Sequence, residues 1–257
     1  MFRAILVLIL VGLLGFAGYI ASLPPTFSVA RSVVIEAPPA TVFSHVNNFK
    51  KWDGWSPWAK KDPDAKTSYE GPESGVGAKF SWAGNDEVGI GDMTITDSTP
   101  NELVGLALNI VEPFPGESAV TFKFAPEGDG TRATWSINGE QPFLERAILT
   151  VMQVNVEKMI GDEYETGLAN LKKVAEADAV DQKAAAEKAA AEAKAKADAE
   201  AAARAKAAAE AKAAAEAKAA AEAKAAAEAK AQAEAEAAAK AAADAEVAFP
   251  AELAPTP

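Results

Sequence analysis

Three kinds of hydrophobic pattern follow one another along this chain. Residues 4–23 form an apolar run of twenty residues without a charge. Across residues 24–180, apolar positions alternate or recur at helical spacing, whereas residues 181–246 are almost only alanine and charged residues. The pattern therefore predicts an apolar helix (1–23), a globular domain and a long polar helix, with a short disordered end at 247–257.

The apolar run is long enough to cross a membrane. A helix of twenty residues spans about 30 Å, which is the thickness of the hydrocarbon core. A cleaved signal peptide is the alternative, since Gly15-Phe16-Ala17 resembles a cleavage site. We favour a retained anchor at residues 4–23, because the apolar cores of signal peptides run only about 7–15 residues. Arg3 before the run and Arg31 after it favour a cytoplasmic amino terminus.

Alternating apolar positions predict the strands of the middle segment. A β-branched strand at 28–37 precedes a short helix at 38–48 that starts at a proline pair. The clearest period-2 runs are residues 78–82, 104–110, 120–124 and 133–137, and residues 88–96 alternate less well. Gly89 and Gly91 suggest a bulge or a bend in that last run. Residues 126–131, "PEGDGT", predict a tight hairpin with glycines free to adopt positive φ.

From about Phe143 to Ala177 the period becomes helical, and we expect one long helix. Gly161 and Gly167 lie inside it, where each costs about 1 kcal/mol relative to alanine. A close approach of the helix to the sheet would account for at least Gly167. The order of elements predicts an α+β fold, in which one curved antiparallel sheet packs on a single long helix. Because such a sheet is large for one helix to cover, we expect a cavity between them.

Several stretches resemble one known family. They are "FKKWDGWSPWAKKDPD" (49–64), "YEGPESGVGAKFSWAGND" (69–86), "GTRATWSINGE" (130–140) and "VEKMIGDEYETGLANLKK" (156–173). Together they resemble the bacterial polyketide cyclase/dehydrase-like proteins of the START, or Bet v 1-like (SRPBCC), helix-grip superfamily, over roughly residues 28–176. The resemblance implies a seven-stranded sheet gripping the C-terminal helix around an apolar pocket. It implies no fixed set of ligand or catalytic residues. For a bacterial chain, the orientation above places the domain in the periplasm, on a single-pass inner-membrane anchor.

Three tryptophans fall within seven residues, in a segment broken by glycine and proline. In one interpretation they are core residues that cap the sheet. In the other, the segment lies at the mouth of the pocket, with Trp55 in the core and Trp52 or Trp58 lining the mouth. The full set of candidate ligand-binding residues is Trp52, Trp55, Trp58, Phe80, Trp82, Leu106, Leu108, Phe122, Phe124, Trp135, Met159 and Ile160.

The sequence offers no catalytic constellation and no metal-binding motif. His45 is the single histidine, and without a second ligand or a triad partner we interpret it as structural or surface-exposed. The chain contains no cysteine, which excludes disulfides and thiolate chemistry. Residues 24–180 carry 13 basic and 23 acidic residues, a balance that argues against nucleic acid as a partner. We expect no cofactor.

The low-complexity segment 181–246 contains lysine and glutamate at a six-residue repeat, which gives Lys-first i,i+4 pairs such as Lys206–Glu210. Alanine is the best helix former, and no continuous apolar face exists to support a coiled coil. The repeat therefore predicts a solvated single helix of about 99 Å. It resembles the alanine-rich spacers of Tol-type envelope proteins in composition. Phe249, beyond this helix, could anchor a docking segment.

Two functions of different class fit these features. The first is a membrane-anchored module that binds a lipid or another apolar small molecule in a helix-grip cavity. The alternative is an envelope scaffold or spacer, whose long helical tail reaches a protein partner. A cyclase- or dehydrase-like enzyme is a third interpretation.

Overall fold

The computed structural model describes residues 2–247 of the chain, which divides into two compact units, one up to Ala185 and the other from Ala186 on. The segment 248–257, with the expected docking residue Phe249, lies outside the described residues. The first unit holds every strand and all helices except the greater part of the last one.

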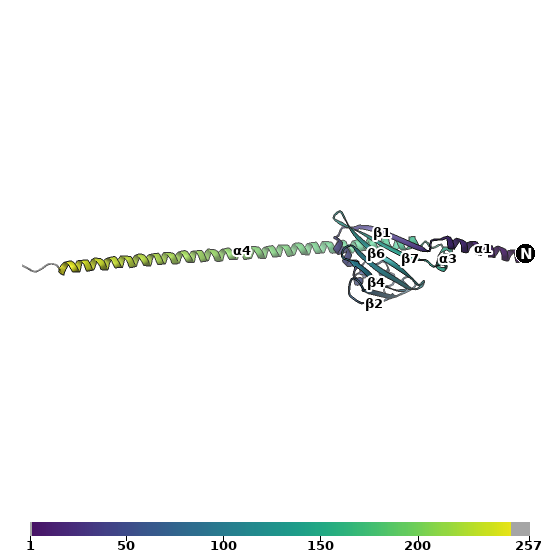
Figure 1. Ribbon diagram of the computed structural model, residues 1–257, viewed down its shortest axis with the longest axis horizontal. Coiled ribbons are helices and arrows are strands. Elements are labelled where there is room, and N and C mark those ends of the chain that lie inside the picture. Colours follow the sequence, from purple (N-terminus) through teal and green to yellow (C-terminus); the bar gives the residue numbers. More distant parts are fainter. Residues whose placement is uncertain (1, 248–257) are drawn as a thin grey trace, which may run out of the picture. The chain divides into compact units, whose positions relative to one another are not determined.

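The apolar run forms α1 (Phe2–Ser22). Among the described residues it is the one helix whose length and composition would allow it to cross a membrane. Almost all of its side chains are exposed, but Ile20 in its last turn is fully buried. The last turn of α1 packs against α3 (Phe143–Val151), and Figure 1 shows the two side by side.

The alternating segments form one antiparallel sheet of seven strands, which confirms the α+β helix-grip fold. The strands are β1 (Thr26–Ile35), β2 (Lys66–Glu70), β3 (Lys79–Ala83), β4 (Ile90–Thr99), β5 (Leu103–Glu112), β6 (Gly116–Glu127) and β7 (Gly130–Glu140), in the order β1-β7-β6-β5-β4-β3-β2. The predicted hairpin joins β6 to β7 through Gly128 and Asp129, and Gly128 has a φ of +58°. The predicted bulge is also confirmed, because the register of β4 shifts between Ile90 and Gly91.

Short helices link β1 to the rest of the sheet. They are α2 (Pro39–Val46), η1 (Phe49–Gly54) and η2 (Trp58–Lys60). Asn48 starts η1, because its side-chain oxygen accepts a hydrogen bond from the backbone N–H of Lys50 at 2.9 Å. This capped turn carries the tryptophan segment over the inner face of the sheet.

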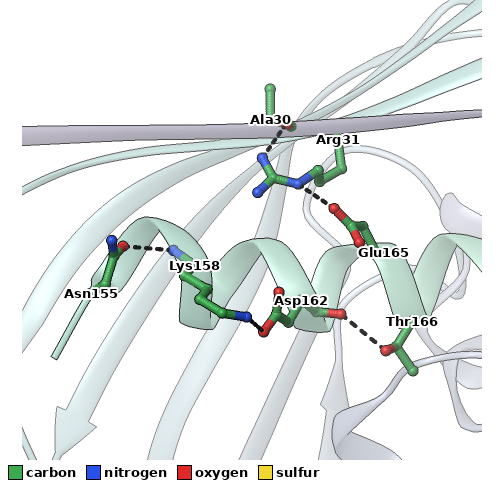
Figure 2. Close-up of polar contacts among 7 residues, drawn as sticks. All are labelled: Ala30, Arg31, Asn155, Lys158, Asp162, Glu165 and Thr166. Atoms are coloured by element: carbon green, nitrogen blue, oxygen red, sulfur yellow. Dashed lines mark hydrogen bonds and ion pairs between the residues drawn. The ribbon is translucent and has the colours of Figure 1, made fainter.

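The expectation of one helix from about Phe143 to Ala177 is wrong. The structure ends α3 at Val151 and starts α4 (Val156–Val247) after a turn in which Gln153 has a φ of +55°. A left-handed residue cannot continue a right-handed helix, so the chain changes direction there. Asn155 then caps α4, since its side-chain oxygen accepts a hydrogen bond from the Lys158 backbone N–H at 2.8 Å (Figure 2).

Two glycines allow α4 to lie close to the sheet. A Cβ atom on Gly167 would stand 2.7 Å from the Trp135 ring and 3.0 Å from Pro57 Cδ, so the predicted close approach is confirmed. At Gly161 the added carbon would collide with the Arg31 guanidinium. Figure 2 shows Arg31 reaching from β1 to α4, where its Nε donates to Glu165 Oε1 at 2.7 Å.

The second unit consists of the alanine-rich part of α4. Its lysines and glutamates form the predicted i,i+4 pairs, with Nζ to Oε1 distances of 3.8–3.9 Å from Lys206–Glu210 to Lys230–Glu234. All of these side chains are exposed. Each pair therefore contributes only about 0.3–0.5 kcal/mol to helix stability.

Candidate functional site

A cluster of aromatic rings fills the space between the sheet and α4. The Trp135 ring on β7 is stacked on Tyr164 of α4 at a centroid distance of 3.9 Å and on Phe122 of β6 at 4.7 Å. The rings of Trp52 and Trp55 meet Trp135 edge-on at 6.3 and 5.6 Å. Burial raises the pKa of the Tyr164 hydroxyl well above its ordinary value, so this group stays neutral.

Hydrogen bonds fix two of these tryptophans. The Trp52 indole N–H donates to the carbonyl of Val46 at 2.9 Å, and that of Trp55 donates to the carbonyl of His45 at 3.2 Å. Trp52 is 4% exposed and Trp55 is fully buried. Both are therefore held in the core by the end of α2, and the capped turn of η1 directs them there.

The register of the sheet shows where the core ends. One row across the inner face is completely buried and consists of Ile95, Leu106, Val120, Ile137 and Val29. The next row towards the start of β1 is half-buried and consists of Phe80, Met93, Leu108, Ser118, Gly139 and Phe27. The buried row is thus entirely apolar, the half-buried row is apolar except for Ser118, and full burial of the inner face stops one row short of the start of β1.

The half-buried row leads to a hollow beside α1 and α3. The Phe27 ring lies against Gly139, where an added Cβ would stand 2.8 Å from the Phe27 Cζ atom. Phe27 also lines a hollow of about 460 Å³, together with Leu23, Leu149, Val154 and more polar residues. Phe27 is thus the one residue of the row that also lines the hollow, at the α3 end of the sheet.

The hollow carries few charges. Arg146 lines it and donates a hydrogen bond to the carbonyl of Leu23, at the end of α1. Among residues 2–247, no carboxylate lies within ion-pair distance of Arg146, although Glu157 lines the same hollow. Burial raises the pKa of the neighbouring Glu145 carboxyl above its ordinary value. The lining of the hollow thus combines apolar side chains with one arginine, one glutamate and several uncharged polar residues.

The candidate ligand-binding residues separate into three groups. Buried members form the core itself: Trp52, Trp55, Leu106, Phe122, Phe124 and Trp135. Half-buried members lie at its edge: Trp58, Phe80, Trp82, Leu108 and Ile160. Met159 is exposed. Of the two tryptophans expected to line a mouth, Trp58 is therefore the one that keeps solvent exposure.

His45 lies on the buried side of α2 and faces α4. Its Nε2 atom is 2.9 Å from Asp178 Oδ2. Burial lowers the pKa of His45 below its ordinary value and outweighs the opposing attraction of Asp178. Within residues 2–247, no three His, Cys, Asp or Glu side chains come together in a way that could hold a metal ion. The contact between His45 and Asp178 therefore links α2 to α4.

Sequence reasoning did not single out Phe27, Met93 or the α3 residues of the hollow. Phe27 continues the alternation of Val29, Arg31 and Val33, so the pattern could have included it. Met93 is obscured by the bulge in β4, which interrupts the period-2 pattern. The α3 residues lie in the segment that was interpreted as part of one continuous helix.

The fold has a counterpart among known proteins. A family model described as "Polyketide cyclase / dehydrase and lipid transport" matches residues 26–176, which is more than half of the chain. This chain belongs to that family. The match begins at the first residue of β1 and ends within α4, so it covers the whole sheet, the aromatic cluster and the half-buried row. No curated protein matches the chain.

Solved structures with a similar fold come from several bacteria. The family member described here is similar to protein CV1439 from Chromobacterium violaceum, with 16% identity, a TM-score of 0.43, and coverage of 60% of this chain and 99% of that one. A Thermobifida fusca protein shows 19% identity and a TM-score of 0.44, over 58% of this chain and 92% of that one. The Aha1 dimer from Colwellia psychrerythraea shows 15% identity and a TM-score of 0.43, over 58% and 96%.

Proposed function

We propose that this protein is a membrane-anchored binding module for a lipid or another apolar small molecule. Membership of a family whose description includes lipid transport supports the ligand class. The observation that carries the proposal is the mostly apolar, half-buried row of the sheet, whose member Phe27 also lines the hollow. A row of this kind is costly to leave in water, and an apolar ligand that covers it would recover that cost.

The ligand-contacting residues that we propose are the half-buried ones. Phe80 and Leu108 lie on the row itself, and Trp82 lies at the next inner-face position of β3. Trp58 lies on η2 and Ile160 on α4, the elements that face the sheet. The buried rings of Trp52, Trp55 and Trp135 would support them as a rigid floor. A ligand that reached deeper would have to separate the stacked rings of Trp135 and Tyr164.

The apolar helix α1 supports the membrane part of the proposal. It is 21 residues long, which corresponds to about 31 Å of helix, and it carries no acidic residue. We propose that it is retained in the inner membrane of a bacterium and that the domain lies in the periplasm. A ligand that partitions into bilayers would then be concentrated next to the domain.

A scaffold function is the second candidate, and one observation favours it. The alanine-rich part of α4 remains a regular helix up to Val247, with charge pairs formed between residues 206 and 234. A semi-rigid helix of this kind suits a spacer that reaches a protein partner. The two functions are compatible, since they use different units of the chain.

Uptake of an apolar fluorescent probe tests the binding function. The row variant Leu108→Gln places an amide on the half-buried inner face of β5, whereas the control Ala107→Gln places it on the exposed outer face. We expect the first variant to weaken probe binding and the second to bind like the wild type. Binding function is refuted if the wild type takes up no probe, and the proposed site is refuted if both variants bind equally well.

A further inference from the structure

Large apolar side chains are exposed together in and around α3. Phe143 and Leu144 begin the helix, Val151 and Met152 end it, and Met159 follows in the first turns of α4. Their exposed fractions are 46%, 69%, 70%, 64% and 53% respectively. Single exposed apolar residues are ordinary, but five within seventeen residues indicate a contact surface that a partner molecule or a membrane covers.

The position of α3 relative to α1 indicates what covers it. Ile20, in the last turn of α1, is fully buried where α1 packs on α3, and Arg146 of α3 donates to the carbonyl of Leu23 just beyond α1. A helix that crosses a bilayer over its whole length has its last turn at the membrane–water interface. Tyr19 lies in that turn and is exposed, as is typical of aromatic side chains at this depth.

From these contacts we infer that α3 and the turn after it lie in the interface of the same bilayer that α1 crosses, with the five exposed apolar side chains inserted among the lipids. The inference rests on the proposed anchoring by α1. It deepens the proposed function, because the hollow lined by Phe27 and Leu149 then opens at the membrane surface. Lipid can pass between the bilayer and the half-buried row without crossing water.

The charges of this surface indicate how it binds. Glu145 and Glu157 are balanced by Arg146 and Lys158, so residues 143–159 carry no net charge. Attraction to anionic headgroups therefore contributes little, and insertion of apolar side chains is the main contribution. We expect the contact to form equally well in zwitterionic and anionic vesicles and to persist in high salt.

Single labels can test this contact, because the chain contains no cysteine. The full chain is reconstituted into phosphatidylcholine vesicles, with an environment-sensitive fluorophore on Leu144→Cys or on Met152→Cys. Val76→Cys is the matched control, since Val76 is apolar, 59% exposed and follows Gly75, whose N–H bonds to Asn47 beyond α2. The next residue, Gly77, bonds through its N–H to Ile95 of β4, and β4 is four strand spacings from β1, about 19 Å across the sheet. Val11→Cys reports whether α1 is inserted.

We expect blue-shifted emission and quenching by lipids with a shallow acyl-chain spin label at positions 144 and 152, and neither effect at position 76. The inference is overturned if positions 144 and 152 behave like position 76, whether or not position 11 is quenched. Quenching at 144 and 152 supports it, even if the domain takes up no apolar probe. Probe uptake by a domain whose α3 labels stay in water would leave the binding function standing and remove the membrane contact.

Discussion

Replacing the two helix glycines one at a time tests how closely α4 lies on the sheet. In both variants, alanine improves helix propensity by about 1 kcal/mol. The two positions differ in what the new methyl group meets. At Gly167 it meets the Trp135 ring at 2.7 Å, and that ring is held by stacking on Phe122 and Tyr164. At Gly161 it meets the guanidinium at the end of the flexible Arg31 side chain.

The expected free energies follow from this difference. Overpacking a well-filled core costs about 1–3 kcal/mol, so Gly167→Ala should lower the free energy of unfolding by about 0–2 kcal/mol after the propensity gain. Displacing Arg31 loses at most the Arg31–Glu165 ion pair, in which Glu165 is largely exposed, and this costs about 0–1 kcal/mol. Gly161→Ala should therefore be neutral or slightly stabilising. Because the propensity gains cancel, the Gly167 variant should be the less stable of the two by about 0–3 kcal/mol, with a central value of about 1.5 kcal/mol.

Urea unfolding of the chain in mild detergent, followed by tryptophan emission, measures this difference. All five tryptophans lie between residues 52 and 135, so the signal reports the first unit and not the alanine-rich helix. A Gly167→Ala protein that is more stable than the Gly161→Ala protein would refute the argument. So would a Gly167→Ala protein that is about 1 kcal/mol more stable than the wild type, since propensity alone would then decide the outcome.

Three further predictions concern other parts of the molecule. In urea unfolding, Trp135→Ala should lower the free energy of unfolding by about 3–5 kcal/mol. Trp58→Ala should lower it by less than about 2 kcal/mol, because the Trp58 ring already lacks neighbours on one side. Equal losses in the two variants would contradict this prediction. Because burial lowers the pKa of folded His45 below the unfolded value near 6.5, the unfolded chain binds more protons in acid, and stability should fall as the pH falls below about 6.5. Comparing thermal unfolding across this range with His45→Asn, which should lose this component of the pH dependence, tests the sign. A peptide of residues 181–246 should show helicity in circular dichroism that does not depend on concentration, and a dimer mass in ultracentrifugation would instead indicate a coiled coil.

The strands could be predicted because alternation is a local property. Residues 104–110 and 133–137 alternate clearly, since one face of β5 and β7 meets the core and the other meets water. The edge strand β2 gives a weaker signal because all five of its residues are exposed. The break between α3 and α4 was missed because apolar residues keep helical spacing across it, and the left-handed residue there is Gln153. Asn155 was the available signal, as a residue favoured at the start of a helix.

The site was predicted less completely than the fold, for a physical reason. Alternation shows which face of a strand is apolar, and it identified Leu106 and Leu108 equally well. It does not show how far a helix covers that face, and in the structure Leu106 is buried while Leu108 is half-buried. Coverage depends on where the tryptophan segment and α4 cross the sheet, which is a property of the whole chain.

Mass spectrometry of compounds extracted from the globular domain tests the central claim most directly. The domain, residues 24–185, would be purified from cells without detergent and extracted with organic solvent. The account predicts one class of lipid or other apolar molecule in amounts comparable to the protein, and less of it in the Leu108→Gln variant. A domain that carries no such molecule, and that takes up no apolar probe afterwards, would contradict the claim that this protein binds apolar ligands.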